Sequence, residues 1–353
     1  MKKLALLLGI AGILAASAFG FVGCDENETP PDDGKHTHSY VDGVCECGKY
    51  EADFITMLPM AQDLQAACDE QGTVERITYQ TRSYALESLP ENAGKELPME
   101  KEALIYLPYG YDASQSYNIV YLMHGTGDNQ VYWLEKMGTT TRNVLDNMIK
   151  DGKCEPTIFV CPTYYSVPEG YPGYDLSTND WMNSDPNADL WPMHFWQELR
   201  SDVIPVVEAK YATYAEGDVS EENLIATRDH RAFAGLSRGS MTVVNSGMMH
   251  CLDLISTFGS YSGIWAEFED FKAALEGEFA EYSVNYWYNG SGTADTTGGA
   301  IDNQTEFVNQ ALEQMPDRFK DGKNLAFTII PGGSHAYNCW LIDLYNSMLV
   351  FFK

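Results

Sequence analysis

Basic residues are scarce in this sequence: 22 Lys and Arg stand against 51 Asp and Glu, which gives the 353-residue chain a formal net charge of −29. Nucleic acids and anionic membrane surfaces attract proteins through clustered Lys and Arg. The composition therefore predicts that neither nucleic acid nor an anionic lipid surface is a partner. It fits a soluble enzyme that acts on neutral or weakly charged polymers.

Cysteine is sparse as well, and no internal repeat is visible. Eight cysteines dispersed over a chain of this length do not make a disulfide scaffold. Cys161 lies in the apolar run 157–161 and is expected to be an inert core thiol. A bridge between Cys251 and Cys339 cannot be tested from the sequence.

The length allows one large α/β domain or two small ones.

Residues 1–23 predict an export signal. Lys2 and Lys3 precede an apolar run, residues 4–21, which is rather short for a transmembrane anchor. Cys24 follows Gly23 as the cysteine of a bacterial lipobox does, so Cys24 is the expected lipidation site. We therefore expect an exported protein, either a cell-surface lipoprotein or secreted, that meets the membrane only through an N-terminal lipid anchor.

Residues 24–72 are predicted to form a tether, because residues 25–35 are acidic and contain two prolines. This segment also carries His36, His38, Cys45 and Cys47, which could supply a tetrahedral zinc site. Cys-x-Cys is tighter than the usual ligand spacing, and no second knuckle follows. A spacer with incidental ligands is the alternative.

From residue 73 to residue 353, strand-like and helix-like segments alternate. Segments rich in β-branched or continuous apolar residues predict strands at 73–79, 103–107, 118–123, 157–161, 232–234, 284–288 and 325–330. Helices are expected at 142–150, 195–211, 241–244 and 338–352. This alternation predicts the α/β class, with a mostly parallel central sheet and helices on both faces.

A Gly-x-Ser-x-Gly motif stands at residues 235–239 and is weak evidence by itself. Its context is informative, because the strand at 232–234 precedes it and a helix follows it. The flanking glycines allow a sharp turn that exposes the serine hydroxyl, and the helix N-terminus favours negative charge there. Ser237 is therefore the predicted nucleophile of an α/β-hydrolase fold. The alternative is a glycine-lined turn with a passive serine.

The base and the acid follow from chain order, which in this fold is Ser, then acid, then His. Only His250 and His335 come after Ser237, and His250 lies thirteen residues along the same predicted helix, about 20 Å away. His335, in the loop after the strand at 325–330, is the predicted base. Asp295, after the strand at 284–288, is the predicted acid. Asp302 is the second choice, because it also suits the start of the next helix.

Oxyanion stabilisation requires preorganised backbone donors. The N–H of Arg238, directly after the nucleophile, is one candidate. The turn after the strand at 118–123 offers the N–H of Thr126 as the other. His124, in the same turn, is expected to be structural.

Several further segments carry a family resemblance, namely 106–112, 121–125, 197–205, 210–216, 228–239 and 324–335. Together they resemble carbohydrate esterase family 1, most closely the feruloyl esterase modules of clostridial xylanases. The resemblance covers about residues 73–353 and implies the triad Ser237, Asp295 and His335 with no cofactor. It also implies that Trp265 packs on a phenolic acyl group, with an ordinary half-buried Trp as the alternative.

Two departures from these modules bear on specificity. Arg238 stands where the modules usually have Met, and it could contact a sugar or carboxylate group or pair with an acid such as Asp128. Residues 164–193 form a longer segment, rich in Tyr and Trp, which could line a sugar cleft or form a surface excursion with no ligand role.

We therefore expect an exported serine esterase that removes feruloyl or related hydroxycinnamoyl groups from plant cell-wall xylan through an acyl-enzyme. The alternatives are an acetylxylan esterase of the same fold, an acyltransferase and a non-catalytic glycan-binding protein. Plant cell-wall polysaccharide, feruloylated or acetylated xylan, is the expected partner.

Overall fold

A computed structural model of the protein describes residues 40–41, 44–45 and 57–353. The predicted export signal, Cys24 and the zinc candidates His36, His38 and Cys47 lie outside the described residues, and for Cys45 only the backbone is described. Within the described ranges, no helix is long and apolar enough to cross a membrane. No group of three or more His, Cys, Asp or Glu side chains in these ranges is placed to hold a metal ion.

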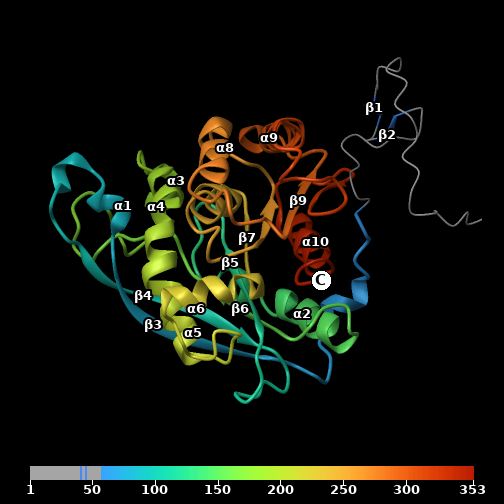
Figure 1. Cartoon of the computed structure of the whole chain (residues 1–353). Helices are drawn as coiled ribbons and strands as arrows, with labels where there is room; N and C mark the ends of the chain where they lie inside the picture. The colour runs from blue at the N-terminus through green and yellow to red at the C-terminus, as the bar shows by residue number, and fades with distance from the viewer. Residues whose placement is uncertain (1–39, 42–43, 46–56) are drawn as a thin grey trace, which may run out of the picture. The chain divides into compact units, whose positions relative to one another are not determined.

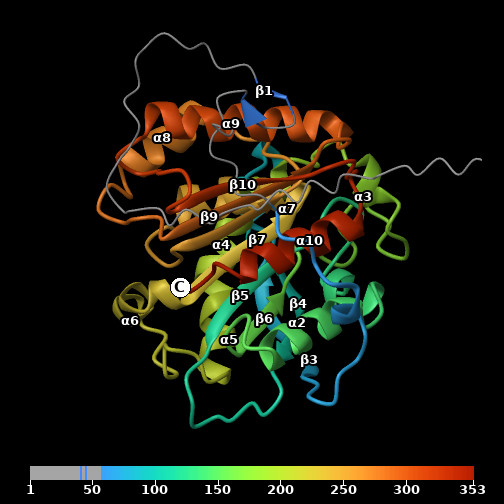
Figure 2. The same ribbon diagram turned by 90° about the vertical axis from the view of Figure 1, so that its right-hand side faces the viewer.

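An eight-stranded sheet forms the centre of the unit (Figures 1 and 2), with strand order β10-β9-β8-β7-β5-β6-β4-β3. Strands β10, β9, β8, β7, β5 and β6 pair in parallel. At the other edge, β4 pairs antiparallel with β6, and β3 pairs antiparallel with β4. The strands are β3 (Thr73–Arg82), β4 (Pro98–Leu107), β5 (Asn118–Met123), β6 (Thr157–Cys161), β7 (Arg231–Leu236), β8 (Thr257–Tyr261), β9 (Tyr286–Gly292) and β10 (Leu325–Ile330). A separate hairpin pairs β1 (Tyr40–Val41) with β2 (Val44–Cys45). The predicted mostly parallel α/β sheet is confirmed.

Helices cover both faces of the sheet, as the views in Figures 1 and 2 show. They are α1 (Tyr84–Glu87), α2 (Thr140–Lys150), α3 (Trp181–Ser184), α4 (Leu190–Glu198), α5 (Ile204–Lys210), α6 (Glu221–Ala226), α7 (Arg238–Thr242), α8 (Phe268–Glu276), α9 (Ala300–Gln314) and α10 (Tyr337–Met348). Short 3₁₀ turns lie at Gln62–Gln65, Pro90–Asn92, Arg228–His230 and Thr297–Gly299, and π-helical turns at Tyr132–Lys136, Leu199–Val203 and Val243–Met248.

The two faces of the sheet carry separate hydrophobic cores, because neighbouring residues of a strand point to opposite faces. In β5, Ile119 and Tyr121 belong to the core under α4, α5, α8 and α9, whereas Val120 and Leu122 belong to the core under α2 and α10. Every residue of β5 is buried. Burial on both faces is the reason why this strand has a nearly continuous apolar sequence.

Most predicted elements are confirmed within a few residues, and β5, β6 and β10 have the predicted bounds. Three predictions are corrected. Residues 289–292, predicted as loop, are the second half of β9. The helix predicted from Phe195 begins at Leu190. Residues 57–72, assigned to the tether, already pack on the folded unit: Leu64 is buried in the core under α2, and the Leu58 N–H donates to Asn346 of α10.

The aromatic side chains of segment 164–193 pack against the hydrophobic core, whereas most of the residues between them are exposed. The core under α4, α5, α8 and α9 contains the buried rings of Tyr164, Tyr165 and Trp191. Three further rings are partly buried against this core, namely those of Tyr171, Tyr174 and Trp181. The rings pack on one another edge to face: the centroids of Tyr165 and Trp181 are 5.0 Å apart, and those of Tyr174 and Trp181 are 5.1 Å apart. Such pairs stabilise a fold beyond their burial. Tyr171, Tyr174 and Trp181 also line a cavity of about 650 Å³, so the sugar cleft and the surface excursion expected from the sequence both stay predictions.

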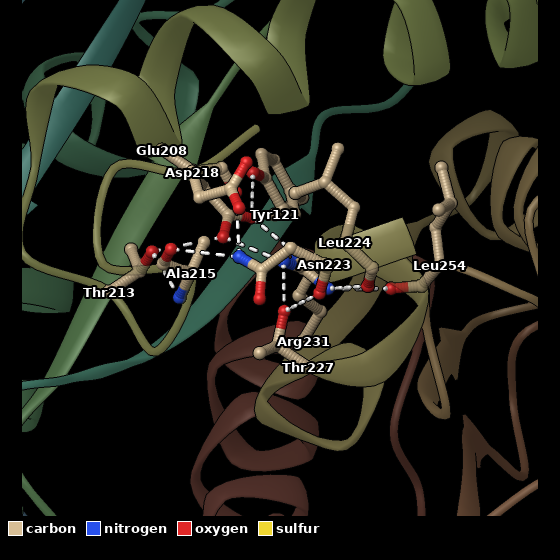
Figure 3. Close-up of polar contacts among 10 residues, drawn as sticks. All are labelled: Tyr121, Glu208, Thr213, Ala215, Asp218, Asn223, Leu224, Thr227, Arg231 and Leu254. Carbon is tan, nitrogen blue, oxygen red and sulfur yellow. Dashed lines mark hydrogen bonds and ion pairs between the residues drawn. The ribbon is translucent and has the colours of Figure 1, made fainter. Parts of the chain in front are cut away.

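A buried ion pair anchors the first residue of β7 (Figure 3). The Arg231 Nε and Nη2 atoms donate to the two carboxylate oxygens of Glu208 at 2.6 and 2.9 Å. Both side chains are 1 % exposed. Glu208 also accepts from the hydroxyls of Tyr121 and Thr213. The pair therefore ties α5 to the central strands, at the end of β7 that lies away from Ser237.

The cysteines between residues 57 and 353 form no disulfide. Cys154, Cys161, Cys251 and Cys339 are buried, and Cys68 is half-buried. Burial raises the pKa of the Cys154 and Cys251 thiols to about 12 and raises that of Cys161 further. The prediction of an inert core thiol at Cys161 is confirmed, and Cys251 and Cys339 are free.

Candidate active site

The turn between β7 and α7 holds Ser237 in an unusual backbone conformation, with φ 53° and ψ −120°. A non-glycine residue at positive φ is strained, and such strain is typical of the serine in a Gly-x-Ser-x-Gly turn. The flanking glycines are required by close packing. A Cβ on Gly235 would lie 2.6 Å from the carbonyl oxygen of Gly239, and a Cβ on Gly239 would lie 2.5 Å from the carbonyl oxygen of His124.

Ser237, His335 and Asp295 form one hydrogen-bonded chain. His335 Nε2 lies 2.8 Å from Ser237 Oγ, and His335 Nδ1 lies 2.9 Å from both carboxylate oxygens of Asp295. A carboxylate only accepts, so Nδ1 carries the proton and Nε2 accepts from the serine hydroxyl. The Asp295 side chain is 0 % exposed and that of His335 is 17 % exposed. The imidazole is therefore held in the tautomer that can take a proton from Ser237.

The two alternatives considered from the sequence lie elsewhere. Asp302 is in the first turn of α9, where a carboxylate is favourable near the helix N-terminus. His250 stacks on Trp196, with ring centroids 4.8 Å apart. Of these carboxylates and imidazoles, only Asp295 and His335 contact each other.

The turn after β5, residues 124–127, lies directly beside the nucleophile. A Cβ on Gly125 would lie 3.3 Å from Ser237 Cβ. The Gly127 N–H contacts the Tyr165 hydroxyl at 3.3 Å, while the Thr126 N–H makes no hydrogen bond within the described ranges. Arg238 is the first residue of α7, so its N–H has no partner inside the helix. Both predicted oxyanion donors are thus N–H groups without a protein acceptor.

His124 is fully buried between these elements, with its Nδ1 2.7 Å from the Gly125 carbonyl and its Nε2 2.8 Å from Thr163 Oγ1. Burial lowers the pKa of His124 to about 3, so the ring is neutral. The expected structural role fits this placement.

Arg238 pairs with Asp189 and not with Asp128. Its Nη1 lies 3.3 Å from Asp189 Oδ1, in an ion pair without hydrogen-bond geometry. Asp128 instead binds Lys136. The Arg238 side chain is 21 % exposed and that of Asp189 is 70 % exposed, so solvent screens the pair. Sequence reasoning missed Asp189, which lies far from residue 238 along the chain and carries no motif.

Trp265 lines a cavity of about 610 Å³ on the side of α7. Apolar residues Met241, Ile264 and Phe268 share the lining, and Asp189 stands at its edge. The Trp265 indole N–H donates to the Gly298 carbonyl at 3.0 Å, in the loop that follows Asp295. The ring is half-buried. Trp265 therefore lies between the acid loop and an open cavity whose lining mixes these apolar residues with polar and acidic ones, such as Asn245 and Glu267.

A serine, histidine and carboxylate chain at the carboxyl edge of a mostly parallel sheet defines the α/β-hydrolase class of fold. Residues 94–350 match the model of the esterase family described as "Putative esterase". The chain belongs to this family, and it is a carboxylic ester hydrolase.

Two xylan-degrading enzymes are similar to this chain over part of their length. The chain is 37% identical over 163 residues to endo-1,4-beta-xylanase Y of Acetivibrio thermocellus, a match that covers 46% of this chain and 13% of the relative. It is 28% identical over 177 residues to an endo-1,4-beta-xylanase/feruloyl esterase of Xylanibacter ruminicola, covering 48% of this chain and 19% of the relative. The chain thus spans less than a fifth of either relative.

Solved structures of esterase modules have the same fold. A serine-to-alanine mutant of the feruloyl esterase module from Clostridium thermocellum, complexed with sinapinate, superimposes with a TM-score of 0.66 at 26% identity, over 85% of this chain and 95% of the module. A ferulic acid esterase of family CE1 from Anaeromyces mucronatus gives a TM-score of 0.60 at 20% identity, over 83% of this chain and 96% of that chain. The predicted resemblance to feruloyl esterase modules of family CE1 is confirmed.

Proposed function

We propose that the chain is a serine esterase that hydrolyses feruloyl or related hydroxycinnamoyl esters on xylan, with Ser237, His335 and Asp295 as its catalytic triad. The observation that carries the proposal is the hydrogen bond from Ser237 Oγ to His335 Nε2 at 2.8 Å, made by an imidazole whose Nδ1–H is bound by a buried carboxylate. A nucleophile, a base and an orienting acid in contact are what acyl transfer by a serine requires.

Acylation begins when Ser237 Oγ attacks the ester carbonyl and its proton passes to His335 Nε2. The N–H groups of Thr126 and Arg238 stabilise the negative charge that develops on the carbonyl oxygen. His335 then gives the proton to the sugar oxygen, which leaves as an alcohol. The acyl-enzyme is hydrolysed by a water that His335 deprotonates, and the hydroxycinnamic acid is released. Asp295 stabilises the imidazolium in both steps. No cofactor is needed.

The acyl group is assigned from two kinds of support. The similar proteins include a feruloyl esterase module complexed with sinapinate and a relative named xylanase/feruloyl esterase. The cavity beside α7 is large enough for a phenolic ring, and the half-buried indole of Trp265 offers it an aromatic surface. The strongly acidic chain also suits a neutral polysaccharide better than a polyanion.

The test is a hydrolysis panel of methyl ferulate, methyl sinapate and acetylated xylan, measured with the wild-type protein and with Ser237→Ala. We expect wild-type activity on the two hydroxycinnamates and a loss of about 10⁴-fold or more in the variant. Activity confined to acetyl esters would replace the feruloyl assignment with an acetylxylan esterase. Acyl transfer to an added alcohol in preference to water would indicate an acyltransferase. Full activity of the Ser237→Ala variant would refute the triad.

The proposal includes export and lipidation at Cys24. Expression in a bacterial host with a radiolabelled fatty acid should label the wild-type chain and leave a Cys24→Ala variant unlabelled. A chain that appears in the medium without a label would be a secreted enzyme, and a chain that stays in the cytoplasm would contradict export.

A further inference from the structure

The peptide unit between Gly125 and Thr126 carries one of the proposed oxyanion donors. This peptide bond is trans. In a planar trans peptide the C=O of one residue and the N–H of the next point in opposite directions. Whatever holds the Gly125 carbonyl therefore also sets the direction of the Thr126 N–H. The group that holds it is the imidazole of His124, whose Nδ1 is 2.7 Å from the Gly125 oxygen.

The hydrogen bonds around His124 leave a single consistent assignment of protons. A carbonyl oxygen only accepts, so His124 Nδ1 must carry a hydrogen and donate it to Gly125. Because the ring is neutral, Nε2 has no hydrogen and must accept one. The Thr163 hydroxyl, 2.8 Å away, supplies it, and Thr163 Oγ1 in turn accepts the Tyr165 N–H at 3.2 Å. The Gly125 carbonyl thus fixes the tautomer, and the Thr163 hydroxyl holds the ring in place by donating to its other nitrogen.

The imidazole cannot leave this position easily. The His124 residue is 1 % exposed, and its ring packs on those of Tyr164 and Tyr165 with centroids 4.5 and 5.7 Å apart. On the other side, a Cβ on Gly125 would meet Leu236 at 2.6 Å and Ser237 Cβ at 3.3 Å. The turn is therefore held between the ring and the nucleophile.

A second buried group holds Thr163 itself. Lys101 Nζ donates to the Thr163 carbonyl at 2.6 Å and lies 2.7 and 2.8 Å from the two carboxylate oxygens of Glu198. Glu198 also accepts the Tyr79 hydroxyl at 2.7 Å. Lys101 and Glu198 are 5 % and 2 % exposed. Tyr79 of β3, Lys101 of β4 and Glu198 of α4 are thus connected by hydrogen bonds to Thr163. Thr163 and His124 connect them in turn to residues 124–127, the turn that carries the proposed oxyanion donor.

We propose that Thr163 and His124 are positioning residues for the oxyanion hole, in which the Thr163 hydroxyl donates to His124 Nε2 and holds the ring in place, and His124 orients the Gly125–Thr126 peptide toward the reacting carbonyl. This inference rests on the proposed function, because it assigns the Thr126 N–H to the oxyanion. Neither residue touches the substrate, and both act through the direction of one N–H group.

The hydroxyl of Thr163 can be removed with little change of shape. In Thr163→Val the buried His124 Nε2 loses its donor, which favours a shift of the ring, and a shifted ring no longer holds the Gly125–Thr126 peptide in its direction. Loss of an oxyanion donor costs about 10²–10³-fold in kcat, and we expect displacement of this donor to cost about 10–100-fold, with KM within about 3-fold. Thr163→Ser keeps the hydroxyl and is the matched control, expected within about 2-fold of wild type because the same hydrogen bond can form.

A boronic acid that adds reversibly to Ser237 separates positioning from general damage, because its tetrahedral adduct places an oxygen where the oxyanion forms. Its affinity for Thr163→Val should fall by the same factor as kcat, while the substrate KM changes little. The melting temperature should fall modestly in this variant, because His124 Nε2 and the Tyr165 N–H lose their buried partner. A variant that loses stability with unchanged boronate affinity would show a merely structural hydroxyl and overturn the inference.

His124 provides an independent pair of variants. His124→Asn can place its amide N–H where Nδ1–H stands, whereas His124→Gln reaches toward the Nε2 position and leaves the Gly125 carbonyl without its donor. We expect His124→Asn to retain more kcat than His124→Gln, at similar KM. If Thr163→Val and His124→Gln keep wild-type kcat while Ser237→Ala is inactive, this inference fails and the triad stands. If Ser237→Ala is active, the proposed function itself fails.

Discussion

The polar groups at the two ends of strand β7 differ in how completely they are hydrogen-bonded. At its first residue, Arg231 uses all five guanidinium N–H groups: two on Glu208, two on the carbonyls of Leu224 and Leu254, and one on the Thr227 hydroxyl. After its last residue the chain enters Ser237 at positive φ, beside N–H groups of Thr126 and Arg238 that have no acceptor among the described residues. One end is saturated with hydrogen bonds, and the other is strained and incompletely paired.

This difference shows how one strand serves two purposes. A buried charge is tolerated only when its hydrogen bonds are complete, so the Arg231 end can tolerate little change. In the proposed mechanism, the free donors at the Ser237 end bind a charge that exists only while the reaction proceeds. Substitutions at the Ser237 end should therefore affect the rate more than the stability, and substitutions at the Arg231 end should do the reverse.

The largest effect is expected for Asp295→Asn. The amide can donate to His335 Nδ1 and so favours the wrong imidazole tautomer, which should lower kcat about 10⁴-fold with the melting temperature nearly unchanged. Initial rates on methyl ferulate and a thermal melt give both numbers. Asp302→Asn, in the first turn of α9, is the matched control and should stay within about 2-fold of wild type, since that carboxylate has no part in the proposed triad. Loss of activity only in Asp302→Asn would reassign the acid.

Glu208→Gln tests the other end of β7. In this variant an amide NH₂ replaces one carboxylate oxygen and faces an N–H of Arg231 or the hydroxyl of Thr213, so two donors meet. The buried Arg231 cation also loses its counter-charge, and the variant should lose about 3–5 kcal/mol of unfolding free energy. Urea denaturation measures the loss, and kcat of the folded fraction should be unchanged. Arg76→Met removes exposed pairs with Glu102 and Glu135 and should cost less than about 1 kcal/mol. Equal losses for the two variants would contradict the comparison.

Ser237→Gly should be more stable than Ser237→Ala, although both are inactive. Glycine adopts positive φ without strain, whereas alanine keeps the Cβ, so we expect a difference of about 1 kcal/mol in favour of glycine. Glu216, also at positive φ with a value of 51°, offers Glu216→Gly as a comparison remote from the chemistry. If the glycine variant is the less stable at position 237, the turn is not strained.

The smallest effect is expected for Arg238→Met. The proposed oxyanion donor at this position is the backbone N–H, which methionine also has. The ion-pair partner of the guanidinium, Asp189, is 70 % exposed, so solvent screens the pair. On uncharged methyl ferulate, kcat should stay within about 5-fold, since the donor that matters is retained. A loss comparable to that of Asp295→Asn would place the guanidinium in the chemistry.

The parts of this protein that sequence predicts well share one physical cause. Strands β5, β6 and β10 are buried on both faces and therefore have continuous apolar sequences with clear ends. The second half of β9 reads as a loop because it is Asn289-Gly290-Ser291-Gly292. Its strand conformation depends on tertiary contacts, such as the parallel pairing with β8 and β10 and the hydrogen bond from Gln304 to Asn289, which no local pattern indicates.

At the candidate active site, too, some residues are predictable from the sequence and others are not. Ser237, Asp295 and His335 were identified by chain order and by their places after strands, and the structure brings them into contact. Asp189, Lys101 and Glu198 were missed, because each pairs with a residue distant in the chain and occurs in no motif. The pairing of Arg231 with Glu208 was missed for the same reason.

The buried thiols bear on how the protein can be produced and attached to a surface. Cys154, Cys161, Cys251 and Cys339 are shielded from solvent, and the raised pKa of these thiols keeps them protonated and unreactive at neutral pH. The folded unit needs no oxidation step, so a reducing cytoplasm should be a suitable host compartment for residues 57–353. Among those residues Cys68 is the most accessible thiol, and it gives a single point for coupling the esterase to a dye or a resin.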